Sequence, residues 1–332
     1  MLSTRLAPGA FGRRPAGCSW VRDELQLFDE ARKSGDLTVR TYYALISPGF
    51  ADADADRLDV AWKQHPDDPI VKTGIVKIMI DGVIESRTAA MLEPYAGTTT
   101  AGAPNYSPAD INRTVAMMDR RGWQIQIHAI GDRGVRMTLD AYEHAMAENP
   151  PPSRGRRHRI EHVETIDPAD IPRFGKLGII ASMQPMHVAL GDMNSLTPAG
   201  QWPDNLGTVR ALRAWQWKRI LDGGARLTFG SDWGVATLDP LPGIRLVSTR
   251  LTPPGMQDQR LSAREAVDGY TAWPAYASFD EQRKGTLAPG MLADIAVLSG
   301  DILSGAADVV VEATVFDGKV VYQRNAKAQS DQ

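Results

Sequence analysis

The sequence predicts an α/β fold of the parallel (β/α)-barrel type, and three observations favour this class. Segments rich in β-branched residues alternate with amphipathic helical segments, which is typical of parallel βαβ units. Polar residues recur near the ends of the predicted strands: His128 and His162 are about one βα unit apart, and His162 and Asp232 about two. The doubly wound alternative usually carries a G-x-G-x-x-G turn after an early strand, and the sequence contains no such motif.

The predicted strands are short segments in which apolar and β-branched residues dominate. We expect them at 37–45, 74–81, 123–130, 157–163, 178–184 and 225–232. Helix start signals lie between and after these strands, each with a capping side chain or an early proline. They are Ser107 before Pro108, Asp132 or Gly134, Asp167 before Pro168, and Ser262 with Glu265 in a capping box.

The composition is that of an ordinary globular protein and excludes several classes of function. The chain has 332 residues, of which 43% are hydrophobic and 23% charged. Its net charge of −3 gives no general attraction to nucleic acid or to an anionic membrane. No run of about 18 apolar residues occurs, so we expect no transmembrane helix. The single cysteine, Cys18, rules out an internal disulfide and a cysteine-based metal cluster, and it fits a reducing cytoplasm.

Changes in composition divide the chain into four segments. Residues 1–22 carry four arginines and no acidic residue, and we interpret them as a disordered lead-in; an organelle-targeting peptide is the alternative to a cytoplasmic protein. Residues 23–283 form the partial barrel domain. Residues 284–325 contain a hairpin signal at Asp317-Gly318 and predict a small β-sandwich segment, and residues 326–332 are a tail.

Four polar residues at or near the ends of predicted strands suggest a metal site. Lys77, His128, His162 and Asp232 would meet at one mouth of a barrel, because the carboxyl ends of its parallel strands converge there. Two imidazoles and a carboxylate suit Zn²⁺ or a similar divalent ion. A lysine ammonium pointing into an apolar barrel is costly, and carboxylation to a carbamate would turn Lys77 into an anionic metal ligand.

Other histidines and tryptophans receive weaker assignments. His187, which follows a strand, is assigned a substrate-binding or outer-shell role, and Trp233, directly after Asp232, is a candidate substrate-binding residue. His158 and His162 have an even spacing on one strand, so we expect both side chains on the same face, with His158 structural. We expect histidines 65 and 144 at the surface. We expect tryptophans 202, 215 and 217 in the core, with the lining of an apolar pocket as the alternative.

Five stretches together resemble the amidohydrolase superfamily, in particular the family 3 branch that includes N-substituted formamide deformylases. They are VKIMIDGVIESRTAAMLEPY, IQIHAIGDRGVRMTLDAYE, RHRIEHVETIDPADIPRFGKLGIIASMQP, LTFGSDWGV and RKGTLAPGMLADIAVL. The resemblance covers roughly residues 24–323 and implies a distorted (β/α)₈ barrel with a small β-sandwich.

The resemblance also implies an activity: a metal-dependent hydrolase that cleaves a non-peptide C–N bond of the amide or formamide type in a small-molecule substrate. Lys77, either as the amine or as a carbamate in the family's manner, would bind the metal with His128 and His162. Asp232 would be both ligand and general base toward a metal-activated water. One or two divalent ions are expected, with zinc as the first choice.

The sequence departs from the family at its start. The family's first barrel strand carries His-x-His, and no such motif occurs here. The six predicted strands correspond to strands 3–8 of a complete barrel. Three interpretations stay open: a fragment of a working hydrolase, an inactive scaffold or binding protein, or a chain whose barrel is completed by a partner, either a second copy or another chain. A serine hydrolase is a poor alternative, because Ser231 lacks the G-x-S-x-G context.

Overall fold

The computed structural model describes residues 20–47, 52–65, 67–189, 200–252, 254–305 and 308–324. Most of the predicted lead-in and all of the predicted tail lie outside the described residues. Helix α1 spans Trp20–Ser34 and therefore begins inside the range predicted as lead-in.

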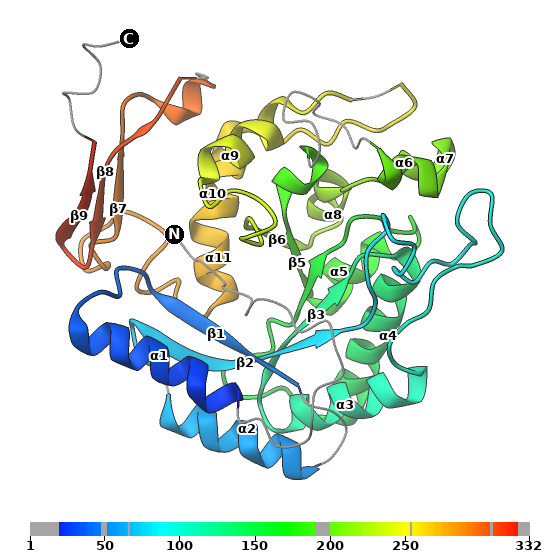
Figure 1. The fold of residues 1–332 in the computed structure, drawn as a ribbon, viewed down its shortest axis with the longest axis horizontal. Coiled ribbons are helices and arrows are strands. Elements are labelled where there is room, and N and C mark those ends of the chain that lie inside the picture. The colour runs from blue at the N-terminus through cyan, green and yellow to red at the C-terminus, as the bar shows by residue number, and fades with distance from the viewer. Residues whose placement is uncertain are drawn as a thin grey trace.

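A six-stranded parallel sheet with strand order β1-β2-β3-β4-β5-β6 forms the centre of the molecule (Figure 1). Each strand overlaps one of the six predicted ranges, so the expected α/β arrangement is confirmed. The strands are β1 Thr41–Ile46, β2 Val71–Met79, β3 Gln124–Ala129, β4 Arg159–His162, β5 Ile180–Met183 and β6 Arg226–Phe229. All neighbouring pairs run parallel, so the carboxyl ends of the strands share one edge of the sheet.

Helices surround this sheet, as Figure 1 shows. The crossover and flanking helices are α2 Asp52–Gln64, α3 Pro108–Arg120, α4 Asp132–Glu148, α5 Ile171–Leu177, η1 Pro185–Ala189, α6 Gln201–Leu206, α7 Thr208–Ala211, α8 Trp217–Asp222, α9 Pro240–Thr249, α10 Ala263–Tyr270 and α11 Ala272–Ala277. Two predicted start signals are confirmed: Ser107 accepts from the backbone N–H of Asp110, and Ser262 and Glu265 form a capping box.

One helix start differs from the prediction. Helix α5 begins at Ile171, whereas the expected signal was Asp167 before Pro168. The intervening residues form a turn in which the backbone N–H of Asp170 donates to the carbonyl oxygen of Asp167 at 2.9 Å. The turn delays the first helical residue because Asp170, and not Asp167, occupies the N-cap position.

The two faces of the sheet differ in chemistry. Residues such as Val76, Ile125 and Ile127 are buried in the main apolar cluster together with helix residues. On the alternate positions, Lys77, Gln126 and Arg159 lie side by side across β2, β3 and β4. The expectation that Lys77 points into an apolar barrel is therefore wrong, because its neighbours across the strands are polar and buried.

A second sheet lies to one side of the first (Figure 1). Its antiparallel strands are β7 Ile295–Leu298, β8 Val311–Phe316 and β9 Lys319–Gln323, with η2 Ile302–Ser304 between the first two. The predicted hairpin turn at Asp317-Gly318 is confirmed, with φ of +50° and +78°. Arg40 ties this sheet to the start of β1, since its Nε lies 2.5 Å from Asp294 Oδ2 and its Nη2 lies 2.8 Å from Asp317 Oδ1.

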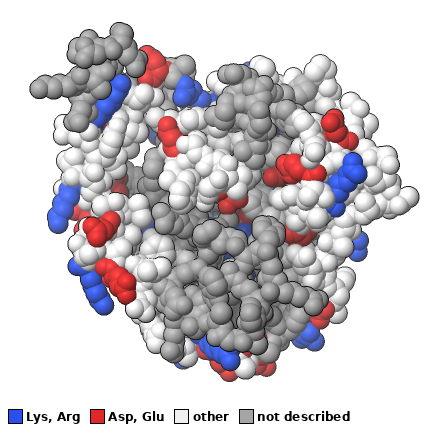
Figure 2. Space-filling view, viewed as in Figure 1, with Lys and Arg blue, Asp and Glu red and all other residues white. Residues whose placement is uncertain are grey.

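The surface agrees with the modest net charge. On the face in Figure 2, acidic and basic side chains are interspersed and not gathered by sign. In the part of the chain that the structure describes, no helix combines the length and the apolarity needed to cross a bilayer.

Candidate metal centre

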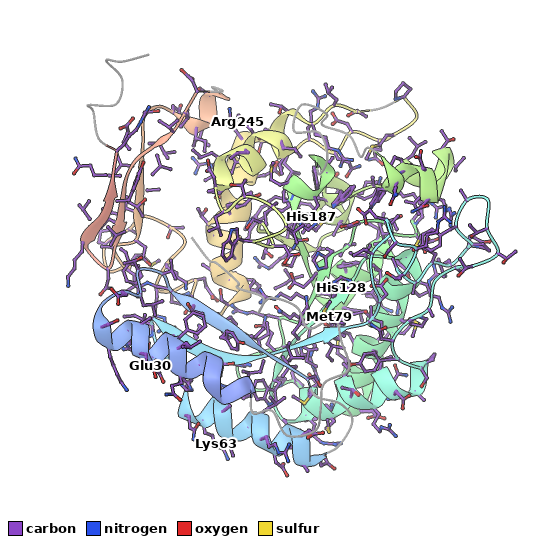
Figure 3. The ribbon with its side chains drawn as sticks, viewed as in Figure 1. Glu30, Lys63, Met79, His128, His187 and Arg245 are labelled. Carbon is purple, nitrogen blue, oxygen red and sulfur yellow. The ribbon has the colours of Figure 1, made fainter. Side chains whose placement is uncertain are left out.

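The four predicted ligands lie at the carboxyl ends of the parallel strands. Lys77 is on β2, His128 on β3 and His162 at the end of β4, while Asp232 follows β6. The rings of His128 and His162 have centroids 4.5 Å apart in an edge-to-face arrangement. The charge of Lys77 affects the pKa values of His128, His162 and Asp232, so the four groups lie close enough to interact electrostatically. In Figure 3, His128 and His187 lie near the middle of the molecule.

The side chain of His162 reaches this neighbourhood because the strand ends there. Regular alternation would place His162 on the same face as Ile160 and His158, which is the face covered by helices. His162 instead has a φ of +78° and the next residue, Val163, a φ of +49°. The prediction that His158 and His162 share one face is therefore wrong: His158 contacts Asp119 of α3, whereas His162 contacts His128. Left-handed backbone at a non-glycine residue is strained, and such strain concentrates at functional sites.

His128 is held by one ring nitrogen. Its Nε2 lies 3.0 Å from the carbonyl oxygen of Gly82 and 3.5 Å from Asp81 Oδ1. A carbonyl oxygen only accepts, so Nε2 carries the hydrogen and Nδ1 keeps a lone pair. Burial, and then the charge of Lys77, lower the pKa of His128 to about 3. The imidazole is therefore neutral at pH 7, as a metal ligand must be.

His162 is held in the same way from its other nitrogen. Its Nδ1 donates to Gln184 Oε1 at 2.9 Å, and this leaves Nε2 as the nitrogen with a lone pair. Burial, with the charges of His128 and Lys77, lowers the pKa of His162 well below its usual value. Metal-bound histidines typically donate their second ring N–H to a carbonyl or carboxylate, and both imidazoles here have such a partner.

Lys77 has the environment of an amine without a counter-ion in contact. It is 2% exposed, and its Nζ is buried with no hydrogen-bond partner within the described ranges. Burial lowers the pKa of Lys77, and the carboxylates of Glu161 and Asp232 oppose this only in part. An ammonium ion is costly under these conditions, and a neutral or modified amine is favoured.

Asp232 completes the group from the loop after β6. Its φ of +51° is again left-handed. Burial raises the pKa of Asp232, while the charges of His187 and Lys77 lower it. A carboxylate whose pKa is raised toward neutrality is better suited to accept a proton from water. The adjacent Trp233, predicted to bind substrate, is 48% exposed.

His187 also lies in this neighbourhood, in η1 directly after β5. Its ring stacks against that of His162, with centroids 6.0 Å apart. Its Nδ1 lies 3.5 Å from Glu164 Oε1, and Glu164 Oε2 accepts from the indole Nε1 of Trp202 at 2.7 Å. The Nε2 of His187 is buried, and none of the described residues forms a hydrogen bond with it.

The residues that hold these groups were not identified from the sequence. Asp81 is buried, and its carboxylate accepts from the backbone N–H groups of Ala90, Ile130 and Gly131, which ties the loop after β2 to the end of β3. Burial raises the pKa of Asp81 to about 7. The other supporting residues that were not predicted are Gln184, Glu164, Glu161 and Arg159. Only the alternation of polar residues in QIQIH and RIEH pointed to a polar interior.

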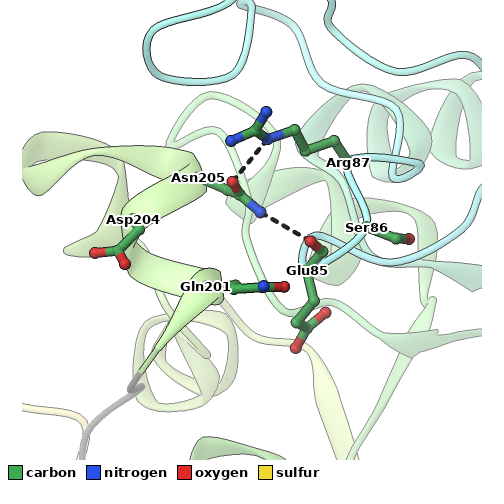
Figure 4. A pocket seen from close by; sticks show the side chains of 6 residues that line it. All are labelled: Glu85, Ser86, Arg87, Gln201, Asp204 and Asn205. Atoms are coloured by element: carbon green, nitrogen blue, oxygen red, sulfur yellow. Dashed lines mark hydrogen bonds between the residues drawn. The ribbon is translucent and has the colours of Figure 1, made fainter.

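A pocket of about 390 Å³ lies between the loop after β2 and helix α6 (Figure 4). Its lining residues are Glu85, Ser86, Arg87, Gln201, Asp204 and Asn205. Asn205 Oδ1 accepts from Arg87 Nε at 2.7 Å and its Nδ2 donates to the carbonyl oxygen of Glu85 at 3.0 Å, so the loop and the helix are directly joined. The pKa of Glu85 is raised by burial and by Glu164 and lowered by His187, which places the pocket next to the strand ends.

The chemistry of the donor set fits a divalent ion. Two neutral imidazoles each keep one nitrogen without a hydrogen in the arrangement above, Lys77 Nζ is buried without a partner, and Asp232 supplies a carboxylate. Within the described residues, no three His, Cys, Asp or Glu side chains already enclose a position for an ion. The lysine must therefore count among the ligands if this set is to hold a metal.

Comparisons with known proteins agree with this chemistry. The model of the amidohydrolase family matches residues 14–322. Protein LONG AFTER FAR-RED 3 of Arabidopsis thaliana is 36% identical over 75% of this chain and 43% of its own length. The N-substituted formamide deformylase of Arthrobacter pascens is 25% identical over 83% of this chain and 50% of its own length. The chain thus spans about half the length of the curated relatives it matches.

The solved structures add the fold. An uncharacterised metal-dependent hydrolase from Pyrococcus furiosus superimposes with a TM-score of 0.70 and 26% identity, over 84% of this chain and 54% of that one. The family match covers the six-stranded sheet, all four candidate ligands and most of the second sheet. The expected resemblance is confirmed, and the chain belongs to the amidohydrolase family.

Proposed function

We propose that this chain carries the catalytic face of a metal-dependent hydrolase that cleaves a non-peptide C–N bond of the amide or formamide type in a small molecule. The observation that carries the proposal is the buried, unpartnered Nζ of Lys77 beside two neutral, anchored imidazoles. An apolar side chain would satisfy a purely structural role at this position without the cost of an unpaired polar group. The formamide class is supported by the name of the Arthrobacter relative.

Lys77, His128, His162 and Asp232 would hold the ion, through His128 Nδ1 and His162 Nε2. When bound, a divalent ion such as zinc polarises the substrate carbonyl and lowers the pKa of water from 15.7 to about 7. Carboxylation of Lys77 would supply the negative charge that the two neutral imidazoles lack. Gly82 and Gln184 would keep both rings oriented through their hydrogen bonds.

Asp232 would move the proton. The attacking water forms the new C–O bond and gives one proton to the Asp232 carboxylate. The same proton then passes to the leaving nitrogen as the C–N bond breaks, so the products are a carboxylic acid and an amine. Burial raises the pKa of Asp232, which strengthens it as a base for the first transfer.

Metal content and turnover test this proposal. Purified protein should contain near-stoichiometric zinc or a similar divalent ion, hydrolyse N-butylformamide to formate, lose this activity with a chelator and regain it with added Zn²⁺. Asp232→Asn should retain part of the metal while turnover falls by at least about 100-fold, which is a typical contribution of a general base. His144→Ala, on the solvent side of α4, is the matched control and should change neither quantity. Protein that binds no divalent ion and shows no hydrolysis would contradict the proposal.

One observation favours a second candidate, an inactive amidohydrolase-like scaffold or binding protein. The described residues contain no ready-made three-ligand site, and the sheet has six strands. In that case zinc content would be negligible, and His128→Ala would leave any binding activity unchanged. The zinc measurement therefore separates the two candidates directly.

A further inference from the structure

A buried nitrogen beside the proposed centre has no hydrogen-bond partner among the residues that the structure describes. His187 is 6% exposed, and its Nε2 is shielded from solvent without a hydrogen bond. Buried polar atoms are paired in the great majority of cases, so an unpaired one requires an explanation. The same ring has a partner at its other edge, where Nδ1 lies 3.5 Å from Glu164 Oε1.

The contact with Glu164 favours the tautomer of His187 in which Nδ1 carries the hydrogen and Nε2 does not. The carboxyl group of Glu164 is buried, and its two oxygens face two different side chains. Oε2 accepts from Trp202 Nε1 at 2.7 Å, and Oε1 faces His187 Nδ1. A carboxylate oxygen only accepts, so in the neutral imidazole we expect the hydrogen on Nδ1, which faces Glu164. Nε2 is then an acceptor with a free lone pair.

The position of His187 shows what this acceptor could meet. Its ring stacks on that of His162 at 6.0 Å, so it flanks the proposed centre without joining the close pair formed by His128 and His162. The pocket of Figure 4 is nearby, because its wall residue Glu85 lies within electrostatic range of both His187 and Glu164. A substrate bound at the proposed centre would therefore lie close to His187.

We propose that the Glu164–His187 pair is an acceptor site for the N–H of a substrate amide, so that the protein selects substrates whose scissile nitrogen carries a hydrogen. His187 makes the contact through Nε2, and Glu164 is a positioning residue that fixes the tautomer. Primary and secondary amides can donate this hydrogen bond, whereas tertiary amides cannot. The inference rests on the proposed function for its choice of substrate.

The tautomer of His187 gives a test that needs neither metal nor turnover. The chain has six histidines, so ¹⁵N-histidine labelling gives a spectrum simple enough to assign, with His187→Gln identifying the His187 signals. At pH 8 the wild-type ring should carry its hydrogen on Nδ1. In Glu164→Gln the single amide oxygen must accept from Trp202, because an indole only donates. The amide NH₂ then faces Nδ1, and the hydrogen of His187 should move to Nε2.

A second substitution controls for general disruption. In Glu164→Gln with Trp202→Phe, the glutamine is free to turn its oxygen toward His187, and the Nδ1–H tautomer should return. A purely structural role for Glu164 predicts no such reversal. Wild-type His187 with its hydrogen on Nε2 would overturn the inference even if neither variant folds. Direct binding of added Zn²⁺ to the His187 nitrogen would overturn it as well.

Paired substrates test the selectivity. N-butylformamide should have a kcat/KM at least about 10-fold higher than N-butyl-N-methylformamide in the zinc-loaded wild type, and Glu164→Gln should reduce this ratio. Equal values for the two formamides in an active enzyme would overturn the inference and leave the proposed hydrolysis intact. Absence of hydrolysis would refute the proposed function, while the tautomer measurement would still decide the role of Glu164.

Discussion

Strand β4 has a buried histidine at each end, and the two differ in how their ring nitrogens are used. His158, just before the strand, has both nitrogens bonded: Nε2 pairs with Asp119 Oδ1 at 3.0 Å, and Nδ1 accepts from the backbone N–H of Ile125 at 3.1 Å. His162, at the other end, has one hydrogen bond among the described residues, from Nδ1 to Gln184. Both ring nitrogens of His158 thus form hydrogen bonds that stabilise the fold. In His162 the lone pair of Nε2 is used by no hydrogen bond among the described residues.

The polar groups around the two histidines differ in the same way. Asp119 also accepts from Arg156 and Asn149, so its charge is fully compensated inside the helix layer. These bonds, led by the one from His158, hold the pKa of Asp119 at about 2 in spite of burial. At the carboxyl ends of the strands, Lys77 Nζ and His187 Nε2 have no hydrogen-bond partner in the described part of the chain. Burial alone therefore does not distinguish His158 from His162; the number of ring nitrogens that are hydrogen-bonded does.

The largest expected effect is on stability at the fully paired end. Asp119→Ala leaves His158 buried and Arg156 half-buried without their carboxylate, so the free energy of unfolding should fall by about 3–5 kcal/mol. Urea denaturation measures this change. Asp222→Ala, which removes an exposed pair with Lys218, should cost no more than about 1 kcal/mol. Equal losses of unfolding free energy in the two variants would mean that the Asp119 cluster stabilises the fold no more than an exposed ion pair does.

The next effect is on metal binding at the unpaired end. His162→Ala should weaken zinc binding by about 100-fold or more, because it removes a ligand and not only its support. Isothermal titration with Zn²⁺ measures the loss, and thermal unfolding of the metal-free variant should show less destabilisation than Asp119→Ala. Zinc affinity equal to that of wild type would remove His162 from the ligand set.

A smaller effect is expected when the support of His162 is removed. Gln184→Ala leaves the imidazole in place but without its acceptor, so zinc affinity should fall by about 10-fold. The same titration applies, with Gln216→Ala as a control, because the side chain of this buried glutamine bonds to the carbonyl oxygen of Leu212 and to Arg219. A loss as large as that of His162→Ala would indicate that Gln184 itself is a ligand.

The smallest effect concerns pH. Burial lowers the pKa of His158 from its usual value near 6.5. The unfolded imidazole therefore binds a proton below pH 6.5 where the folded one does not, so stability is complete above this pH and declines as the pH falls below it. The wild-type Tm should drop between pH 7.5 and 5, and His158→Phe should show a shallower drop. An identical slope would assign the acid sensitivity to the other buried histidines, His128 and His162.

Local patterns in the sequence were sufficient for the framework but not for the contacts within it. The alternation in 123–130 predicted β3, and Ser262 with Glu265 predicted the start of α10, because both signals depend on neighbouring residues. The grouping of His128 with His162 followed from strand spacing. Their anchoring partners Gly82 and Gln184 could not be predicted, because hydrogen bonds between distant segments leave no local signature.

The face of the sheet on which a side chain lies could be predicted only where the strands are regular. Even spacing misplaced His162 because a left-handed residue at the end of β4 breaks the alternation. The alternation of polar and apolar residues in β3 and β4 indicated the polar interior around Gln126 and Arg159. The expectation of an apolar barrel prevented this interpretation. Glu164 had no sequence signal, since its role depends on Trp202 from a distant helix.

Asn205 connects helix α6 to the loop after β2 through side-chain hydrogen bonds. It bonds to Arg87 and to the carbonyl oxygen of Ile84 on the loop, while Trp202, on the same short helix, bonds to Glu164. One short helix thus holds both the loop that lines the pocket and the carboxylate that faces His187, with Asn205 and Trp202 as its two points of attachment.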